Sequence, residues 1–345
     1  MSRQKIIIAL LSVVFIIGIV ILINSIGDAE PDFLQILDEN PESFERDISD
    51  ISYQTSILAD TTSIFQPAQI RINNNLTYVN DFADFTIYEY DDEGNQKRKL
   101  TTTRGRGPGE ILHLTDFDIK DDIIWLADSQ SMRVTSYSIE TGENIHTFSL
   151  ENRPMRITCL KDGFIVQWIG TELLFSKFDY EGNEIHQFGE IVEDQYQHQM
   201  SLGGTIRSNR DDRFVYIPFY SSLIYHYDSS GELINILKAP DGVHFPFTRR
   251  EGATAFAPDF SYMRDGYLDE NDNLYVFTRI PEDENESSNE SLIAYLDKYN
   301  LRTAEYLESV RLYDHYTSVM YNTYENTIYA SDFEKSFLFQ LNQDF

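Results

Sequence analysis

The chain has 345 residues, enough for one large domain or two smaller ones, so burying a core needs no disulfide or metal. Aromatic residues make up 14% of it, a content that excludes intrinsic disorder as its general state. The 27 Lys and Arg residues against 57 Asp and Glu residues give a formal net charge of −30, which repels phosphate backbones, so we expect no binding of nucleic acid. The single cysteine, Cys159, excludes an internal disulfide and a thiolate metal cage.

The first residues predict one membrane-spanning segment. Residues 6–23 carry no charge and would form about 27 Å of helix, close to a bilayer core, whereas the apolar core of a cleaved signal peptide usually spans about 7–15 residues. We therefore expect an uncleaved signal anchor, and Arg3 and Lys5 before it favour a domain that lies in the periplasm or outside the cell. Ser25 and Gly27 could instead end a signal peptide that is removed, and a cytosolic core helix is the remaining alternative.

Beyond this segment, one unit recurs six times: two short strand-like runs around a polar loop, the second run followed by an acidic turn. The first runs are residues 76–79, 123–126, 164–168, 214–217, 274–277 and 327–330, and the second runs are residues 85–90, 134–137, 175–178, 224–227, 292–296 and 337–341. Four of the turns close with Gly94, Gly142, Gly182 and Gly231, at intervals of about 40–50 residues, which is the period of a propeller blade. In the fifth copy we expect Asn300 to take the place of the glycine.

A further run before and after each unit completes four strands, which we name A to D in chain order. The sequence thus predicts an all-β fold, a six-bladed β-propeller of four-stranded blades in residues 49–345, after an anchor in residues 1–27 and a linker in residues 28–48. The acidic stretch Pro281–Glu290 is expected to be a solvated insertion in the fifth blade. The sixth unit has no strand D of its own, and pairing with the spare run Asp50–Leu58 would close the ring and cover an open sheet edge.

Charge divides between the two faces of the predicted ring. The B–C loops and D–A connections share one face (the B–C/D–A face), and the A–B and C–D turns share the other (the A–B/C–D face), which is rich in Asp and Glu. The candidate ligand-binding residues on or near the B–C/D–A face are Arg104, Arg106, Arg133, Arg249, Arg250, Trp168, Phe245 and Phe247, and Arg153 and Arg279 lie there too. Such arginines could bind a carboxylate, a sulfate or a sugar acid, or could only neutralise acids of the same face such as Glu110 and Asp128.

No motif of a zinc protease, a phosphate-binding loop, a dinucleotide-binding turn or a nucleophile elbow occurs in the sequence, so we assign no catalytic residue and no metal. His146 and His186 stand at the same position of two copies, which indicates outer-strand surface residues and not a metal pair. The stretch Asp269–Asn273 is similar to the start of a calcium loop. It is expected to be an A–B turn, because Leu274 and Ile280 replace the Gly and Glu that such a loop requires.

The segment between the first two blades carries a family motif. Its residues are Gly105, Arg106, Gly107, Pro108, Gly109 and Glu110, followed by Ile111. It resembles the Gly-Arg-Gly-Pro-Gly-Glu-Phe signature of six-bladed β-propeller proteins from the cell envelope of Bacteroidetes-type bacteria, relatives of NHL-repeat and TolB-like propellers. The resemblance implies this fold and compartment and assigns no reaction; many such proteins look like lipoproteins, and without an N-terminal cysteine an uncleaved anchor is the alternative. The glycines allow a tight loop with exposed amides, which Glu110 could cap.

Two functions are compatible with these features. The first is a membrane-tethered, non-catalytic propeller that binds a protein, peptide or glycan through its B–C/D–A face and needs no cofactor. The alternative is a calcium-dependent hydrolase or lactonase similar to the gluconolactonase and paraoxonase propellers, with calcium in the central tunnel. Asp128 and Asp332, at corresponding ends of strand B, are its first candidate positions.

Overall fold

The computed structural model describes residues 42–49, 53–59, 63–192, 195–209, 212–258, 261–281, 292–312, 316–322, 327–332 and 337–343. Within these residues the regular secondary structure consists of β-strands, and no helix is long and apolar enough to cross a membrane. The predicted membrane segment and the acidic residues 282–290 lie outside the described residues. The chain divides into two compact units, and the fold below is that of the larger one, Pro41–Glu190 with Asp194–Phe345.

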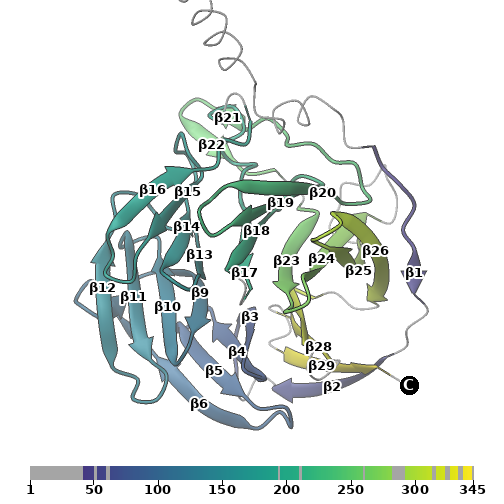
Figure 1. Ribbon diagram of the computed structural model, residues 1–345. Helices are drawn as coiled ribbons and strands as arrows, with labels where there is room; N and C mark the ends of the chain where they lie inside the picture. The colour runs from purple at the N-terminus through teal and green to yellow at the C-terminus, as the bar shows by residue number, and fades with distance from the viewer. Residues whose placement is uncertain are drawn as a thin grey trace, which may run out of the picture. The chain divides into compact units, whose positions relative to one another are not determined.

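Six antiparallel sheets form the blades of this unit (Figure 1). The first three blades are β3 (Pro67–Asn73), β4 (Leu76–Asp81), β5 (Thr86–Tyr90) and β6 (Gln96–Thr101); β9 (Leu114–Lys120), β10 (Ile123–Asp128), β11 (Arg133–Ser138) and β12 (Asn144–Ser149); and β13 (Arg156–Cys159), β14 (Phe164–Gln167), β15 (Phe175–Phe178) and β16 (Glu184–Phe188). The last three are β17 (Gly204–Ser208), β18 (Arg213–Pro218), β19 (Leu223–Asp228) and β20 (Leu233–Lys238); β23 (Met263–Leu268), β24 (Asn273–Pro281), β25 (Leu292–Asn300) and β26 (Glu305–Leu312); and β27 (Ser318–Asn322), β28 (Thr327–Asp332) and β29 (Phe337–Gln343). The predicted six-bladed all-β propeller is confirmed.

The innermost strands form a closed circle, in which β3, β9, β13, β17, β23 and β27 each contact the next and β27 contacts β3. Neighbouring blades cover the middle strands on both faces, so β18 is buried along almost its whole length, whereas the outer strand β12 has no fully buried residue. Aromatic side chains fill the gap between blades: the ring of Phe214 lies 5.0 Å from that of Tyr227 and 6.0 Å from that of Phe175. Burying one such side chain contributes about 1.5–3 kcal/mol to stability.

The turns after strand C have the backbone conformation that the sequence predicts in four blades. Their glycines, Gly94, Gly142, Gly182 and Gly231, have φ between 69° and 86°. In the fifth blade the prediction is wrong, because the left-handed residue is Ala304, with φ of 55°, and not Asn300. The side-chain oxygen of Asn300 accepts the backbone N–H groups of Arg302 and Thr303 at 2.9 and 3.1 Å, so Asn300 opens this turn as an Asp or Ser residue opens the others.

A strand from the start of the described region lies beside the last strand of the chain. β2 (Tyr53–Ala59) runs antiparallel to β29, with Tyr53 opposite Gln343 and Ser56 opposite Gln340. Figure 1 shows the purple strand β2 along the yellow strand β29. The sixth sheet therefore has the strand order β2, β29, β28 and β27, the same number of strands as the blades before it.

The residues before β2 pack on the fifth blade. β1 (Ile48–Ser49) pairs in parallel with β26, outside the four strands of that blade. Two guanidinium nitrogens of Arg46 donate to both carboxylate oxygens of Asp241 at 2.7 and 2.8 Å, and Nε donates to Asp297 at 3.1 Å. Burial by itself would lower the pKa of Arg46, but its hydrogen bonds to the two carboxylates outweigh burial and raise it. Residues 42–48, predicted as part of a linker, thus contact the propeller.

Candidate functional site

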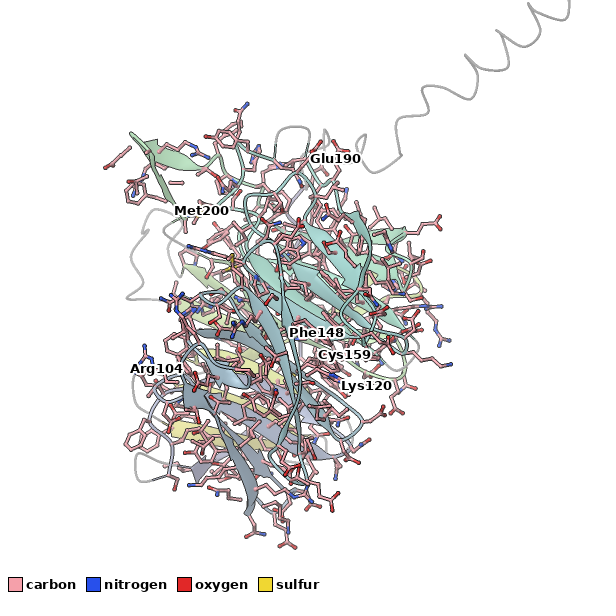
Figure 2. All side chains as sticks on the ribbon, turned by 90° about the vertical axis from the view of Figure 1, so that its left-hand side faces the viewer. Arg104, Lys120, Phe148, Cys159, Glu190 and Met200 are labelled. Carbon is pink, nitrogen blue, oxygen red and sulfur yellow. The ribbon has the colours of Figure 1, made fainter. Side chains whose placement is uncertain are left out.

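The two faces of the ring differ in the side chains that they expose. Large apolar side chains exposed on the B–C/D–A face are Phe65, Phe82, Met132, Tyr196 and Phe247, and none is exposed in a described turn of the other face. The A–B/C–D face instead exposes acids such as Asp92, Glu93 and Glu181. Figure 2 shows the propeller from the side, with Arg104 at the left edge and Lys120, the last residue of the inner strand β9 (Leu114–Lys120), well to its right.

The glycine-rich family motif is folded back on itself. β7 (Thr103–Arg104) and β8 (Glu110–Ile111) pair in parallel across it. The carboxylate of Glu110 accepts the N–H of Gly107 at 2.5 Å, so the expected capping of the loop amides by Glu110 is confirmed. A Cβ atom on Gly105 or on Gly107 would overlap this carboxylate, which explains why glycine occupies both positions.

Hydrogen bonds from the second blade hold the same motif in place. Nη1 of Arg133 donates to the carbonyl oxygens of Arg106 and Gly107 at 2.7 and 3.2 Å, and the hydroxyl of Tyr137 donates to the carbonyl oxygen of Gly109 at 2.5 Å. These contacts give the motif a structural role and use part of the hydrogen-bonding capacity of Arg133. The side chain of Arg106 remains exposed.

A second group of candidates lies on the connection between the fourth and fifth blades. β21 (Arg249–Glu251) and β22 (Thr254–Phe256) form a hairpin there, visible at the top of Figure 1. Arg250 donates from Nη2 to the side-chain oxygen of Gln199 at 2.9 Å, and its Cζ lies 4.1 Å from the ring centre of Tyr196. The hairpin is therefore anchored to the connection between the third and fourth blades.

The other exposed candidates pair cations with aromatic rings. Cζ of Arg104 lies 5.7 Å from the ring centre of Phe85, and Cζ of Arg249 lies 4.9 Å from that of Phe256. Phe247 is 71% exposed, the largest fraction among the large hydrophobic side chains of the described residues. Arginine stacked on an aromatic ring keeps its outward N–H groups available for a ligand.

Two candidates lie in the core. Trp168 is 3% exposed, and its indole N–H donates to Ser176 at 2.7 Å, while its backbone N–H donates to Leu174, whose loop covers the end of strand β14. Phe245 is 8% exposed, with its ring 6.5 Å from that of Tyr225. Both rings contribute to packing inside the blades and not to the exposed face.

The structure also shows a buried group that the sequence did not reveal: a ring of alternating charges near the axis. Arg71 of β3 pairs with Asp116 of β9, and Arg207 of β17 pairs with Asp265 of β23. The guanidinium of Arg71 also lies 3.8 Å from the carboxylate of Asp265, and that of Arg207 lies 3.8 Å from Asp116. We call these four residues the charge ring. All four are charged residues of inner strands, and the inner strands of Asp116 and Asp265 carry other charges as well, so nothing in the sequence sets the ring apart.

Burial and ion pairing shift the pKa values of the charge-ring residues Arg71 and Asp265 in opposite directions. Burial lowers the pKa of Arg71, and the neighbouring charge of Arg207 lowers it further. Burial would raise the pKa of Asp265, but the charges of Arg207 and Arg71 outweigh burial and lower it. Ser318 of the sixth blade donates to Asp265 at 3.0 Å. The backbone N–H of Ile157 in the third blade donates to Asp116 at 3.2 Å. The ring thus links inner strands from all six blades, and its four side chains carry no net charge.

A cavity of about 390 Å³ lies at the opposite end of the inner strands, on the A–B/C–D face. Its wall includes Asp118, whose carboxylate accepts the N–H of Cys159 at 2.7 Å and the hydroxyl of Thr158 at 3.0 Å. Burial raises the pKa of Asp118 and that of the Cys159 thiol, so this cysteine stays protonated and unreactive near neutral pH. The cavity does not include the candidate arginines, which lie on the other face.

Asp128, the first candidate calcium ligand, already accepts hydrogen bonds from backbone N–H groups. The carboxylate oxygens of Asp128 accept four hydrogen bonds from the connection before the second blade and from the loop after β10. The donors are the N–H groups of Leu112, His113, Gln130 and Ser131, at 2.7, 3.1, 3.1 and 3.0 Å. Asp332, at the same place in the sixth blade, is 4% exposed. Among the described residues, no group of three or more His, Cys, Asp or Glu side chains could hold a metal ion.

The other sequence predictions agree with the structure. His146 lies in the outer strand β12 and His186 in the outer strand β16, in different blades. Asp269–Asn273 connects β23 to β24, and the carboxylate of Asp269 accepts the N–H groups of Asn271 and Asn273 at 2.8 Å each, as expected for an A–B turn.

Comparisons with known proteins agree with the architecture. Residues 42–277 match the model of DUF5128, described as a 6-bladed β-propeller. A member of the DUF4221 family from Bacteroides vulgatus has a similar structure, with a TM-score of 0.57 and 12% identity over 89% of this chain and 99% of that one. The β-propeller domain of Cps50 (Swd1) from Myceliophteria thermophila has a TM-score of 0.51 and 11% identity over 83% and 99% of the two chains.

A virginiamycin B lyase from Staphylococcus aureus has a TM-score of 0.50 and 10% identity over 85% of this chain and 99% of its own. At such identities the similarity to these structures shows the fold alone. Curated protein sequences gave no match. The match to the family model covers more than half of the chain, and the blade order agrees with it. The chain belongs to the DUF5128 family of six-bladed β-propellers.

Proposed function

We propose that this protein is a membrane-tethered, extracytoplasmic β-propeller that binds a protein, peptide or glycan through its B–C/D–A face, without catalysing a reaction. The observation that carries the proposal is the gathering of exposed aromatic side chains and arginines on that face. β-Propellers commonly act as interaction modules. The loops and connections of the B–C/D–A face expose large apolar side chains that the described turns of the other face lack, while further exposed apolar residues such as Ile57, Ile185 and Ile234 lie on outer strands.

The chemistry of that face suits recognition. Aromatic side chains such as Phe247 and Tyr196 supply large contact areas at low conformational cost, and Arg104, Arg106 and Arg249 supply directional hydrogen bonds. The acids of the A–B/C–D face and the net charge of −30 disfavour the approach of an anionic partner to that side. A partner with both apolar and acidic groups therefore has one favourable face to contact.

The tether rests on the sequence of the N-terminus. Residues 6–23 have the length and apolar character of a membrane span, and Arg3 and Lys5 precede them. In this arrangement the positively charged end stays in the cytoplasm and the propeller lies in the periplasm or outside the cell. The membrane then limits the search for a ligand to the envelope.

We further propose that β2 closes the propeller. The antiparallel pairing of β2 with β29 supports this, as does the contact between the inner strands β27 and β3 of the last and first blades. Without β2, strand β29 would present a free edge, which invites pairing with other chains. Closure by β2 keeps the binding face in one geometry.

A calcium-dependent hydrolase or lactonase has less support. The oxygens of Asp128 are occupied by backbone N–H groups, and the two acids of the charge ring, Asp116 and Asp265, are paired with arginines. The structural similarity to a lyase, at 10% identity, extends only to the fold. A calcium-dependent rise in the melting temperature together with turnover of a lactone would favour this alternative.

The proposal is tested by a thermal-shift and calorimetric screen of the full chain in detergent, with envelope glycans and acidic peptides, with and without calcium. In the test variant, Arg104, Arg106, Arg249 and Arg250 are replaced together by alanine. In the control variant, Asp92, Glu93 and Glu181 of the other face are replaced by alanine. We expect the test variant to lose affinity for a captured glycan or peptide that is large enough to contact the exposed arginines, and the control variant to keep it. Equal binding by the wild type and the test variant would reject the B–C/D–A face.

A further inference from the structure

Three arginines near the axis on the B–C/D–A face form no ion pair with another described residue. Arg156 begins β13, Arg264 is the second residue of β23, and Arg279 lies near the end of β24. Inner strands run from the B–C/D–A face toward the other face, and strand β24 runs back, so all three positions are at the same end of the ring. In the part of the chain that the structure describes, no salt bridge involves these arginines, whereas Arg71 and Arg207 of the charge ring are each paired.

Their hydrogen bonds are few and go to uncharged groups. Nη1 of Arg156 donates to two backbone carbonyls, at 2.7 and 3.3 Å, and Nη1 of Arg264 donates to the hydroxyl of Ser261 at 2.8 Å. Nε of Arg279 is buried and has no hydrogen-bond partner among the described residues. A buried donor without a partner costs about 1–3 kcal/mol, so its retention calls for a physical reason.

Backbone and ring contacts hold the three side chains in one region. The backbone N–H of Arg279 donates to the carbonyl oxygen of Tyr262 at 2.8 Å. The backbone N–H of Tyr262 in turn donates to the carbonyl oxygen of Phe219, also at 2.8 Å. The guanidinium carbon of Arg156 lies 5.4 Å from the ring centre of Phe219. Tyr220, next in sequence, completes this wall from the loop between β18 and β19. Residues from three neighbouring blades therefore surround one position.

The ionisation of the group reflects burial and the charges around it. Burial and then the charge of Arg264 lower the pKa of Arg279 to about 10. Burial also lowers the pKa of Arg264 and that of Arg156. Burial raises the pKa of Tyr220, while the charges of Arg264 and Arg156 oppose that rise, so Tyr220 lies within the field of both. All these groups remain protonated at neutral pH and together form a centre of positive charge.

The charge ring supplies no full counter-charge, because its two arginines and two aspartates balance each other. Its aspartates oppose the effect of burial only in part: burial lowers the pKa of Arg156, although the charges of Asp116 and Asp265 act to raise it. Three further cations thus remain in a chain whose net charge is −30, in a partly buried position where water screens them poorly. Unpaired charges in such a place are costly unless a counter-ion is bound. The planar N–H groups of arginine match the oxygens of a carboxylate or a sulfate.

We propose that Arg156, Arg264 and Arg279 bind one oxyanion group, a carboxylate or a sulfate, of a ligand that enters from the B–C/D–A face. The hydroxyl of Tyr220 lies beside the bound group as an additional donor. The net charge of the chain disfavours polyanions, so the ligand carries its anionic group on an otherwise neutral body, such as an acidic sugar. This inference rests on the proposed function because it names the chemistry that the same face recognises.

The test uses glucuronate and inorganic sulfate as probes and glucose as the uncharged control, at constant ionic strength kept with sodium chloride. Calorimetry and thermal shift are measured on the full chain in detergent, for the wild type and for Arg264→Gln and Arg279→Gln. Arg98→Gln, on the exposed outer strand β6, is the matched control. We expect an anion to bind the wild type and Arg98→Gln, and each of the other variants to lose about tenfold or more in affinity. Binding of glucuronate or of sulfate identifies the carboxylate or the sulfate as the recognised group.

A second readout separates binding from a purely structural role. If the arginines repel one another, Arg279→Gln without ligand melts at or above the wild-type temperature; if they only hold the fold together, it melts below it. Lack of any anion binding by the wild type, or unchanged binding by Arg264→Gln and Arg279→Gln, would overturn the inference. The exposed-arginine variant described above should still bind glucuronate or sulfate, so a failure of the outer face and a failure of this site give different results.

Discussion

The charge ring offers the strongest prediction about stability. Replacing Arg71 by methionine keeps most of the side-chain volume but leaves Asp116 and Asp265 facing one cation, Arg207, instead of two. The substitution also removes the hydrogen bond from Nε of Arg71 to the carbonyl of Phe117 at 3.0 Å. Breaking a buried ion pair from one side typically costs about 3–5 kcal/mol, a large part of the roughly 5–15 kcal/mol of a folded protein.

The measurement is urea unfolding followed by the fluorescence of the buried residues Trp125 and Trp168. The double variant Arg71→Met with Asp116→Asn restores charge balance and keeps an acceptor for the N–H of Ile157, so it should be more stable than Arg71→Met alone. Lys97→Met, which removes an exposed ion pair, is the control and should barely shift the midpoint. A midpoint for Arg71→Met as close to the wild type as that of Lys97→Met would refute the reasoning.

Three other predictions concern the edge of the ring, a buried histidine and a turn. Cysteines at Ser56 and Gln340, which face each other across β2 and β29, should form a disulfide that adds about 2–4 kcal/mol to stability; failure of the oxidised chain to cross-link would contradict closure by β2. Burial lowers the pKa of His226 to about 4, so protonation favours the unfolded chain, and stability should fall by about 3 kcal/mol as the pH drops from about 6.5 to 4. His226→Gln should remove that part of the pH dependence in urea titrations, and an unchanged profile would show that the histidine is not responsible. Gly182→Ala, at φ of 86° with an aromatic ring where Cβ would lie, should lower the melting temperature more than Gly252→Ala, at φ of 62° with open space around it; equal losses would exclude the steric argument.

The sequence predicted the blades because each blade carries its own local pattern. Alternating apolar runs recur in all six blades and a turn glycine such as Gly94 recurs in four of them, and each is set by neighbours within about ten residues. The prediction failed in the fifth blade because Asn300 opens the turn, and the left-handed conformation falls four residues later on Ala304, as Gly142 follows Ser138 in the second blade. Alanine is not a residue that marks a left-handed turn position in a sequence.

Contacts between distant parts of the chain could not be predicted from the sequence. Arg46 binds Asp241 and Asp297, which lie 195 and 251 residues farther along the chain. No local pattern predicts that a single arginine in a polar stretch is buried. The charge ring is a similar case, since only the circular order of the blades brings its members together. Trp168 was expected near the mouth because it ends a strand, but the following loop covers it.

The central claim, that the B–C/D–A face meets the ligand, is tested most directly by photo-crosslinking in intact cells. Benzoylphenylalanine is introduced in place of Phe247 or Met132 on that face, and in place of Glu93 or Glu181 on the other face. The account predicts that the first two positions form covalent adducts with the same envelope component and that the last two form none. Adducts from Glu93 and Glu181, with none from Phe247 and Met132, would contradict it.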